Sequence, residues 1–167
     1  EEEVGGLMGL LAEFLETELQ ELHKEGARLL HIGHLEGLGQ PLRSKVEDAI
    51  ELTKNNKHID VILAFNYGGR DEIICAVRKL IEEGTLAEDV DVESMSAAMF
   101  TAGTPDPDIV ISTSGEKRSS NFLTWQTVYS EWFFPEVYWP DFDAEDLHEV
   151  LREYAKRDRR FGGLSKK

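Results

Sequence analysis

The chain has 167 residues, a formal net charge of −15, a hydrophobic fraction of 41% and a charged fraction of 31%. This length suits one domain with a real core, and the composition is ordinary for a soluble globular protein. So acidic a chain repels nucleic-acid phosphates and anionic lipid headgroups, which argues against nucleic-acid binding. The single cysteine, Cys75, excludes an internal disulfide and a zinc site built of thiolates alone, and it fits a reducing, cytoplasmic compartment.

The first third of the chain predicts a helix, a strand and a second helix. Residues 4–25 carry leucines and a methionine at helical spacing with glutamates on the other faces, which predicts one long amphipathic helix ending at Gly26. The short apolar segment at 27–33 predicts a strand. A second helix is expected over residues 41–54, with Pro41 in its first turn.

The strongest strand signal lies at residues 59–65, because a nearly continuous apolar run is typical of a parallel strand buried on both faces. The glycine-rich turn at 66–70 lacks the G-K-[ST] of a phosphate loop, so its glycines predict a tight path into the next helix. That helix is expected to bury an apolar stripe made of Ile73, Ile74, Val77, Leu80 and Ile81. An acidic loop at 84–92 and a short helix at 93–101 follow.

The last third again alternates strands with helices. Strands are predicted at residues 109–111 and 133–138, with a helix over 121–131 between them and a last helix after Asp143. The inward-facing residues of that last helix are predicted to be Leu147, Val150, Leu151 and Tyr154. This alternation predicts an α/β fold with a mainly parallel sheet flanked by helices, and such sheets bind ligands beyond the carboxyl ends of their strands.

The polar turn at 112–120 follows such a strand end. It is dense in hydroxyl groups and carries a glycine, a lysine and an arginine before a predicted helix. Hydroxyls, amides at a helix N-terminus and an arginine together suit a phosphate group. An ordinary capped turn, with Ser119 or Ser120 as the N-cap and Arg118 in a surface ion pair, explains the same residues. The residues by themselves leave both interpretations open.

Glu131 lies among aromatic residues, where an isolated buried carboxylate is costly and needs a partner. A magnesium ion or an arginine would serve, since Mg²⁺ typically binds one or two carboxylates together with substrate phosphate oxygens. An ordinary structural ion pair is the alternative. His31 and His34 are candidate metal ligands, but the histidines match no known metal-binding motif, so we expect them to be non-catalytic.

Five segments, in the same order, resemble the cis-prenyltransferase family, which is best known from undecaprenyl diphosphate synthase. They are N-Y-G-G-R at 66–70, S-T-S-G-E-K-R-S-S-N-F-L-T-W-Q at 112–126, Y-S-E at 129–131, W-P-D-F at 139–142 and R-R-F-G-G at 159–163. The resemblance implies Mg²⁺-dependent condensation of isopentenyl diphosphate with an allylic diphosphate to give a polyprenyl diphosphate. It also implies a homodimer, and it allows a peripheral membrane contact for the lipid product.

By position, the resemblance implies that Arg118, Ser119 and Ser120 hold the diphosphate of isopentenyl diphosphate. It implies that Glu131 is the second carboxylate of a magnesium site, contributed by the partner subunit or from across the site. Ser112 stands where the family has an arginine, so one bidentate phosphate clamp is lost. We expect weaker isopentenyl diphosphate binding or a different acceptor geometry, and enzymes of this fold that join prenyl units irregularly could carry such a change.

The family's M-D-G-N-G-R-W-A segment, whose aspartate binds Mg²⁺, does not occur in the sequence, so the resemblance implies no catalytic residue in this chain. Residues 1–167 are expected to form a single domain that corresponds to the C-terminal two-thirds of a cis-prenyltransferase. The leading strands of the sheet are then expected on an earlier segment or on another chain. The alternative functions are a non-catalytic partner subunit of a two-component prenyltransferase and an unrelated phosphate-binding domain.

Overall fold

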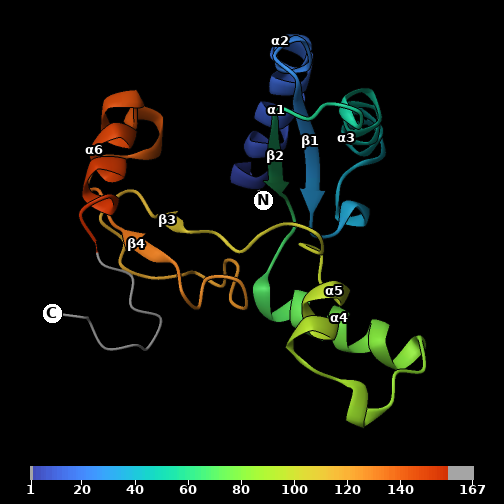
Figure 1. The fold of residues 1–167 in the computed structure, drawn as a ribbon. Coiled ribbons are helices and arrows are strands. Elements are labelled where there is room, and N and C mark those ends of the chain that lie inside the picture. Colours follow the sequence, from blue (N-terminus) through green and yellow to red (C-terminus); the bar gives the residue numbers. More distant parts are fainter. Residues whose placement is uncertain (1, 158–167) are drawn as a thin grey trace, which may run out of the picture. The chain divides into compact units, whose positions relative to one another are not determined.

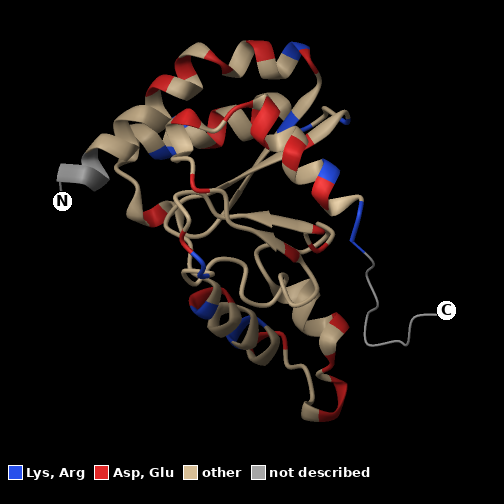
Figure 2. Cartoon of the chain, turned by 90° about the vertical axis from the view of Figure 1, so that its left-hand side faces the viewer, with Lys and Arg blue, Asp and Glu red and all other residues tan. Residues whose placement is uncertain are grey.

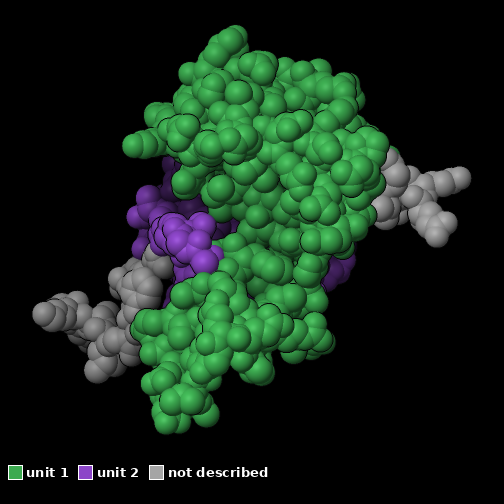
Figure 3. Space-filling model, turned by 90° about the vertical axis from the view of Figure 1, so that its right-hand side faces the viewer, with its two compact units in different colours: residues 1–101 green, residues 102–167 purple. Residues whose placement is uncertain are grey.

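The computed structural model describes residues 2–157, and residues 2–5 by their backbone only, so the R-R-F-G-G segment at 159–163 lies outside the described residues. The chain divides into two compact units, residues 1–101 and 102–167 (Figure 3). Each unit holds a two-stranded parallel sheet accompanied by helices, so the predicted α/β class is confirmed (Figure 1). Compact units need not be separate domains, and the single domain over residues 1–167 stays a prediction.

Two helices open the first unit in place of the one predicted over residues 4–25. α1 spans Glu2–Thr17 and α2 spans Leu19–Lys24. The hydroxyl of Thr17 donates to the carbonyl oxygen of Glu13 at 3.0 Å, a side-chain contact that competes with helical backbone bonding and bends helices. Gly26, with a φ of 77°, ends the segment as predicted.

The parallel sheet of this unit confirms two predicted strands. β1 (Ala27–Ile32) pairs with β2 (Ile59–Ala64), with Ala27 opposite Ile59. α3 (Gln40–Thr53) connects them, because two parallel strands require a crossover. Pro41 lies in the first turn of α3, as its fixed φ and missing N–H favour.

The core of the first unit lies between α1, α3 and one face of this sheet. Its buried residues are Leu11, Leu15, Leu29, Leu38, Val46 and Ala49. The alternate residues Val61, Leu63 and Phe65 pack partly against that core, whereas Asp60 and Ala64, on the opposite face of the strand, are exposed. Burial of β2 on both faces is therefore a wrong prediction for the described unit, because only one side of the pleat meets the helices.

α4 (Gly69–Glu82) and α5 (Val92–Ala98) follow the N-Y-G-G-R turn and pack against each other. The buried residues of α4 are Gly69, Glu72, Ala76 and Leu80. Of the predicted stripe, Leu80 is buried and Ile73 is half-buried. Ile74, Val77 and Ile81 are 49%, 39% and 70% exposed, so their burial is a wrong prediction for this unit. The reason is tertiary: the residues of α4 that become buried are those spaced four apart along the face that α5 covers.

The second unit is built around two short parallel strands. β3 (Ile109–Ile111) pairs with β4 (Glu131–Phe133), with Ile109 opposite Glu131. The strand predicted at 133–138 thus begins and ends earlier, and Pro135, which has no N–H to donate, follows its end.

The helix predicted over residues 121–131 is absent, and residues 121–129 form turns. Ser120, Asn121 and Leu123 have φ values of 48°, 62° and 45°. A right-handed helix cannot include residues in this left-handed conformation, which explains the wrong prediction.

α6 (Ala144–Tyr154) begins at its predicted N-cap. The Asp143 carboxylate accepts hydrogen bonds from the amides of Glu145 and Asp146 at 2.8 and 3.1 Å. Val150 is buried as predicted, but Leu147 and Leu151 are 40% and 43% exposed, so their inward orientation is wrong for the described unit.

Carboxylates are spread over the helices of both units, with fewer lysines and arginines between them (Figure 2). Among the described residues, no helix combines the length and the apolar character that crossing a bilayer requires.

Candidate diphosphate site

The polar turn predicted to bind phosphate leaves the carboxyl end of β3 and docks against the chain that follows β4. Three amides at its start, those of Ser112, Ser114 and Gly115, donate to carbonyl oxygens of residues 133–137 at 2.8–2.9 Å. These amides are committed to the protein itself. A phosphate bound by this turn therefore relies on side chains farther along it.

Those side chains are exposed. The Arg118 guanidinium is 64% exposed and forms an ion pair with Glu116 of the same turn. Ser119 and Ser120 are exposed as well, and the Ser112 hydroxyl donates to the carbonyl oxygen of Glu116 at 3.0 Å. The ion pair agrees with the capped-turn interpretation, but no helix follows for a serine to cap. The diphosphate role of these residues stays a prediction.

Glu131 opens β4 and has an arginine partner. Arg157, just beyond α6, donates to the Glu131 carboxylate at 2.5 Å and to the Glu153 carboxylate at 2.9 Å. Its guanidinium carbon lies 4.0 Å from the centre of the Phe133 ring, a cation–π contact. The hydrogen bonds that Arg157 donates to Glu153 and Glu131 raise its pKa above its usual value. Sequence reasoning missed Arg157, although it follows Glu153 by four residues, a spacing at which side chains near a helix end can meet.

Ser112 and Glu131 lie at opposite ends of the parallel sheet. Ser112 follows the carboxyl end of β3, and its amide meets Phe133, whereas Glu131 begins β4, and its amide meets Asp108. Three residues of strand separate these ends by about 10 Å. The structure thus gathers Ser112, Arg118, Ser119 and Ser120 in one loop, and it does not bring Glu131 beside Ser112.

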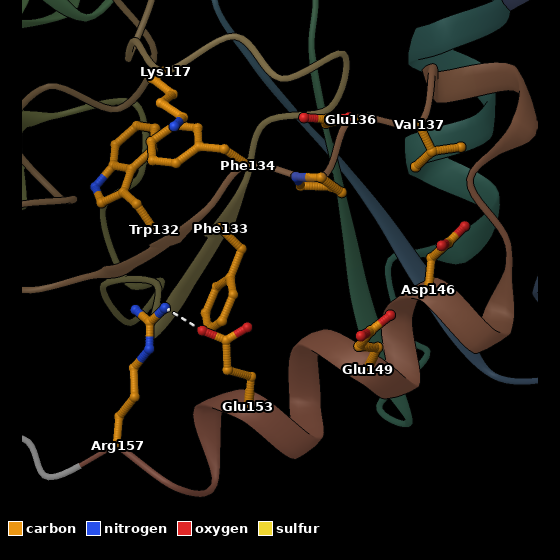
Figure 4. A pocket seen from close by; sticks show the side chains of 11 residues that line it. Lys117, Trp132, Phe133, Phe134, Glu136, Val137, Asp146, Glu149, Glu153 and Arg157 are labelled. Atoms are coloured by element: carbon orange, nitrogen blue, oxygen red, sulfur yellow. Dashed lines mark hydrogen bonds and ion pairs between the residues drawn. The ribbon is translucent and has the colours of Figure 1, made fainter.

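A cavity of about 570 Å³ lies beside the Arg157 ion pairs (Figure 4). It is lined on one side by Lys117 and by aromatic residues of β4 and the chain after it, and on the other side by one face of α6. The charged residues of the lining are Lys117, Glu136, Asp146, Glu149, Glu153 and Arg157. Because four carboxylates outnumber two cations, this cavity repels a bare diphosphate, and the polar turn remains the better candidate.

The N-Y-G-G-R turn has structural contacts, in line with its interpretation from sequence. The Asn66 side-chain amide donates to the carbonyl oxygen of His34 at 3.0 Å, and the His34 amide donates to the carbonyl oxygen of Asn66 at 3.1 Å. The Tyr67 hydroxyl donates to the carboxylate of Glu72 at 2.5 Å, and Glu72 is only 1% exposed. This turn also brings His34 within 2.6 Å of Asp71.

Comparison with known proteins places these features in a family. The family model described as putative undecaprenyl diphosphate synthase matches residues 1–162. The isoprenyl transferase of Agrobacterium fabrum is 46% identical over 169 residues, covering 99% of this chain and 68% of that protein. The isoprenyl transferase of Clostridium acetobutylicum is 45% identical over 170 residues, covering 98% of this chain and 66% of that protein.

Solved structures agree with these relatives. A probable undecaprenyl diphosphate synthase from Campylobacter jejuni matches with a TM-score of 0.88 and 31% identity, over 97% of this chain and 76% of that one. Lavandulyl diphosphate synthase from Lavandula x intermedia matches with a TM-score of 0.92 and 34% identity, over 97% of this chain and 72% of that one. The chain spans about two thirds of the length of the curated relatives it matches. On its sequence and its fold alike, it belongs to the undecaprenyl diphosphate synthase (isoprenyl transferase) family of cis-prenyltransferases.

Proposed function

We propose that the protein catalyses cis-prenyl chain elongation, in which isopentenyl diphosphate condenses with an allylic diphosphate to give a polyprenyl diphosphate. The observation that carries the proposal is the alignment of 98–99% of the chain, at 45–46% identity, with proteins named isoprenyl transferases. The proposal includes a homodimer and a peripheral membrane contact through which the lipid product leaves.

The residues of the polar turn have distinct roles in this proposal. Arg118 binds the diphosphate with paired N–H donors, the geometry in which a guanidinium matches phosphate oxygens, and the hydroxyls of Ser119 and Ser120 donate to the same group. The ion pair between Arg118 and Glu116 is exposed, and exposed pairs contribute only about 0–1 kcal/mol. A diphosphate therefore displaces Glu116 from Arg118 at small cost.

Glu131 is the residue of this chain that we propose to hold Mg²⁺. One carboxylate combined with substrate phosphate oxygens and water is a donor set that Mg²⁺ commonly uses, so the residue fits the ion. Bound Mg²⁺ neutralises negative charge on the diphosphate. Arg157 donates to the same Glu131 carboxylate and retains Glu153 as a second partner, so it can give up Glu131 without being left unpaired.

A second candidate is an irregular-coupling prenyl diphosphate synthase of the same fold. Ser112 favours it, because a hydroxyl cannot replace the two parallel hydrogen bonds of an arginine. The likeness to lavandulyl diphosphate synthase, which was crystallised with dimethylallyl diphosphate, points the same way.

The test is an assay of the complete gene product with labelled isopentenyl diphosphate, Mg²⁺, and dimethylallyl, geranyl or farnesyl diphosphate. Long products that require both substrates are expected. Products formed from dimethylallyl diphosphate alone would identify irregular coupling instead. A lack of turnover with every primer would contradict both and favour a non-catalytic partner subunit.

Arg118→Ala provides the test of the site. Loss of hydrogen bonds to a charged group costs about 1.5–3 kcal/mol, so kcat/KM for isopentenyl diphosphate should fall about 10- to 150-fold. Arg152→Ala is the matched control, because Arg152 is 61% exposed and pairs with a glutamate in the same unit. Equal losses in both variants would remove Arg118 from the site.

A further inference from the structure

Three side chains with different ligand atoms meet in the first unit, outside the polar turn and Glu131. His34 lies in the loop after β1, and Asp71 and Cys75 lie four residues apart on one face of α4. The His34 Nε2 atom is 2.6 Å from the Asp71 Oδ2 atom, and the Cys75 Sγ atom is 3.9 Å from each of them. Among the described residues, this is the group of histidine, cysteine and carboxylate side chains whose ligand atoms lie close enough to hold one ion.

The backbone around His34 is held in place by contacts that do not involve its ring. Two hydrogen bonds join the main chain of His34 to Asn66. Gly33 has a φ of 108°, and a Cβ there would lie 2.4 Å from the carbonyl oxygen of Phe65, so only glycine permits this approach. The ring packs edge-on against Phe100, with 5.3 Å between ring centres. Such support pre-organises a ligand for an ion.

We propose that His34, Asp71 and Cys75 form a zinc site. Zinc binds sulfur at about 2.3 Å and nitrogen or oxygen at about 2.0–2.1 Å. In a tetrahedral site the nitrogen and oxygen ligand atoms are then about 3.3 Å from each other, and the sulfur is about 3.6 Å from each of them. Relative to the observed distances, the imidazole and carboxylate have to separate by about 0.7 Å, and the sulfur has to approach by about 0.3 Å. The His34 and Asp71 side chains are 41% and 54% exposed, so small rotations provide these shifts.

The donor set selects the kind of ion. A thiolate and an imidazole suit Zn²⁺, whereas Mg²⁺ prefers oxygen ligands alone. The thiolate and the carboxylate together match the charge of a divalent ion. Three protein ligands leave the fourth tetrahedral position to water, the arrangement of a site with an open position.

The surroundings of His34 and Cys75 bear on how each side chain would bind the ion. The Glu36 carboxylate lies 3.9 Å from the Nδ1 atom of His34, beyond hydrogen-bond distance, on the side from which outer carboxylates orient metal-bound imidazoles. Burial raises the pKa of the Cys75 thiol, and the charge of Asp71 raises it further. Zinc binding therefore requires the Cys75 thiol to release its proton to solvent as the ion binds, without any change in redox state.

The experiment is a titration of the untagged chain with Co²⁺, which reports tetrahedral thiolate coordination by colour, followed by displacement with Zn²⁺. We expect a thiolate-to-cobalt charge-transfer band that one equivalent of zinc removes. Cys75→Ser should abolish the band. It should also weaken zinc binding by more than about 100-fold, because mutating residues that only contact a ligand costs about 10- to 100-fold. Glu36→Gln, a change of that milder kind, should weaken zinc binding by about 10-fold.

His148→Gln is the matched control, because His148 is an exposed histidine of α6 in the other unit. It should bind zinc as the unchanged chain does. Asp71→Asn serves as a second ligand variant, and circular dichroism verifies that each variant folds. The absence of a charge-transfer band, or equal zinc affinity of the unchanged chain and Cys75→Ser, would overturn the site. The readout is metal binding and does not depend on prenyl transfer.

Discussion

Removing the hydroxyl of Tyr67 should destabilise α4, because this hydroxyl forms a hydrogen bond with a buried carboxylate of the helix. The hydroxyl donates at 2.5 Å to the carboxylate of Glu72, which is 1% exposed. The amide and hydroxyl of Thr101 donate to the other carboxylate oxygen at 3.3 and 3.4 Å. A hydrogen bond to a charged group contributes about 1.5–3 kcal/mol, so we expect Tyr67→Phe to cost about 2 kcal/mol.

Amide hydrogen exchange of α4 is the appropriate measurement, because the three tryptophans all lie in the second unit and do not report on the first. A loss of about 2 kcal/mol in opening free energy raises exchange rates in α4 about 30-fold. Tyr138→Phe removes the same hydroxyl from a side chain that is 67% exposed, and it should change rates by a factor of about 2 or less. A rise of less than about 3-fold in Tyr67→Phe would refute the assigned role of this hydrogen bond.

Three further predictions concern the first unit. Gly33→Ala should cost about 2 kcal/mol or more in urea denaturation followed by circular dichroism, because its Cβ would lie 2.4 Å from the Phe65 carbonyl oxygen at a φ of 108°. Gly9→Ala, in the interior of α1 with nothing within 4 Å of its Cβ, should instead stabilise by about 0.5–1 kcal/mol. Thr53→Val should cost about 1–3 kcal/mol by the same method, since the buried Thr53 hydroxyl accepts a hydrogen bond from the Leu29 amide of β1 at 2.9 Å. An unchanged urea midpoint would contradict this. Burial lowers the pKa of His31, so the folded state binds fewer protons than the unfolded state. The resulting stability is fully present above the unfolded pKa of about 6.5 and declines as pH falls toward the folded pKa. His31→Gln should flatten that decline, and an identical pH dependence in both proteins would exclude His31 as its source.

Local chemistry made much of the fold predictable from sequence. Asp143 begins α6 because its side chain caps the first amides, and Pro41 enters α3 at a position where its missing N–H costs nothing. The apolar runs of β1 and β2 were likewise sufficient to place both strands. The predicted diphosphate residues fall in one loop because they are neighbours along the chain.

Backbone conformation and burial were not predictable in the same way. Ser120 and Asn121 adopt left-handed conformations that their residue types do not require, and the helix predicted over residues 121–131 is therefore absent. The exposed side of α4 depends on where α5 packs, which the hydropathy of α4 does not reveal.

The sequence by itself determined the alternation of strands and helices in the first unit, the parallel α/β class and the family, because each depends on patterns within a few consecutive residues. Only the tertiary structure decided that Arg157 pairs with Glu131 and that His34 meets Asp71 and Cys75. These partners lie 26, 37 and 41 residues apart in the chain. Contacts at such separations depend on chain crossings and on packing between elements, which no local pattern of residues specifies.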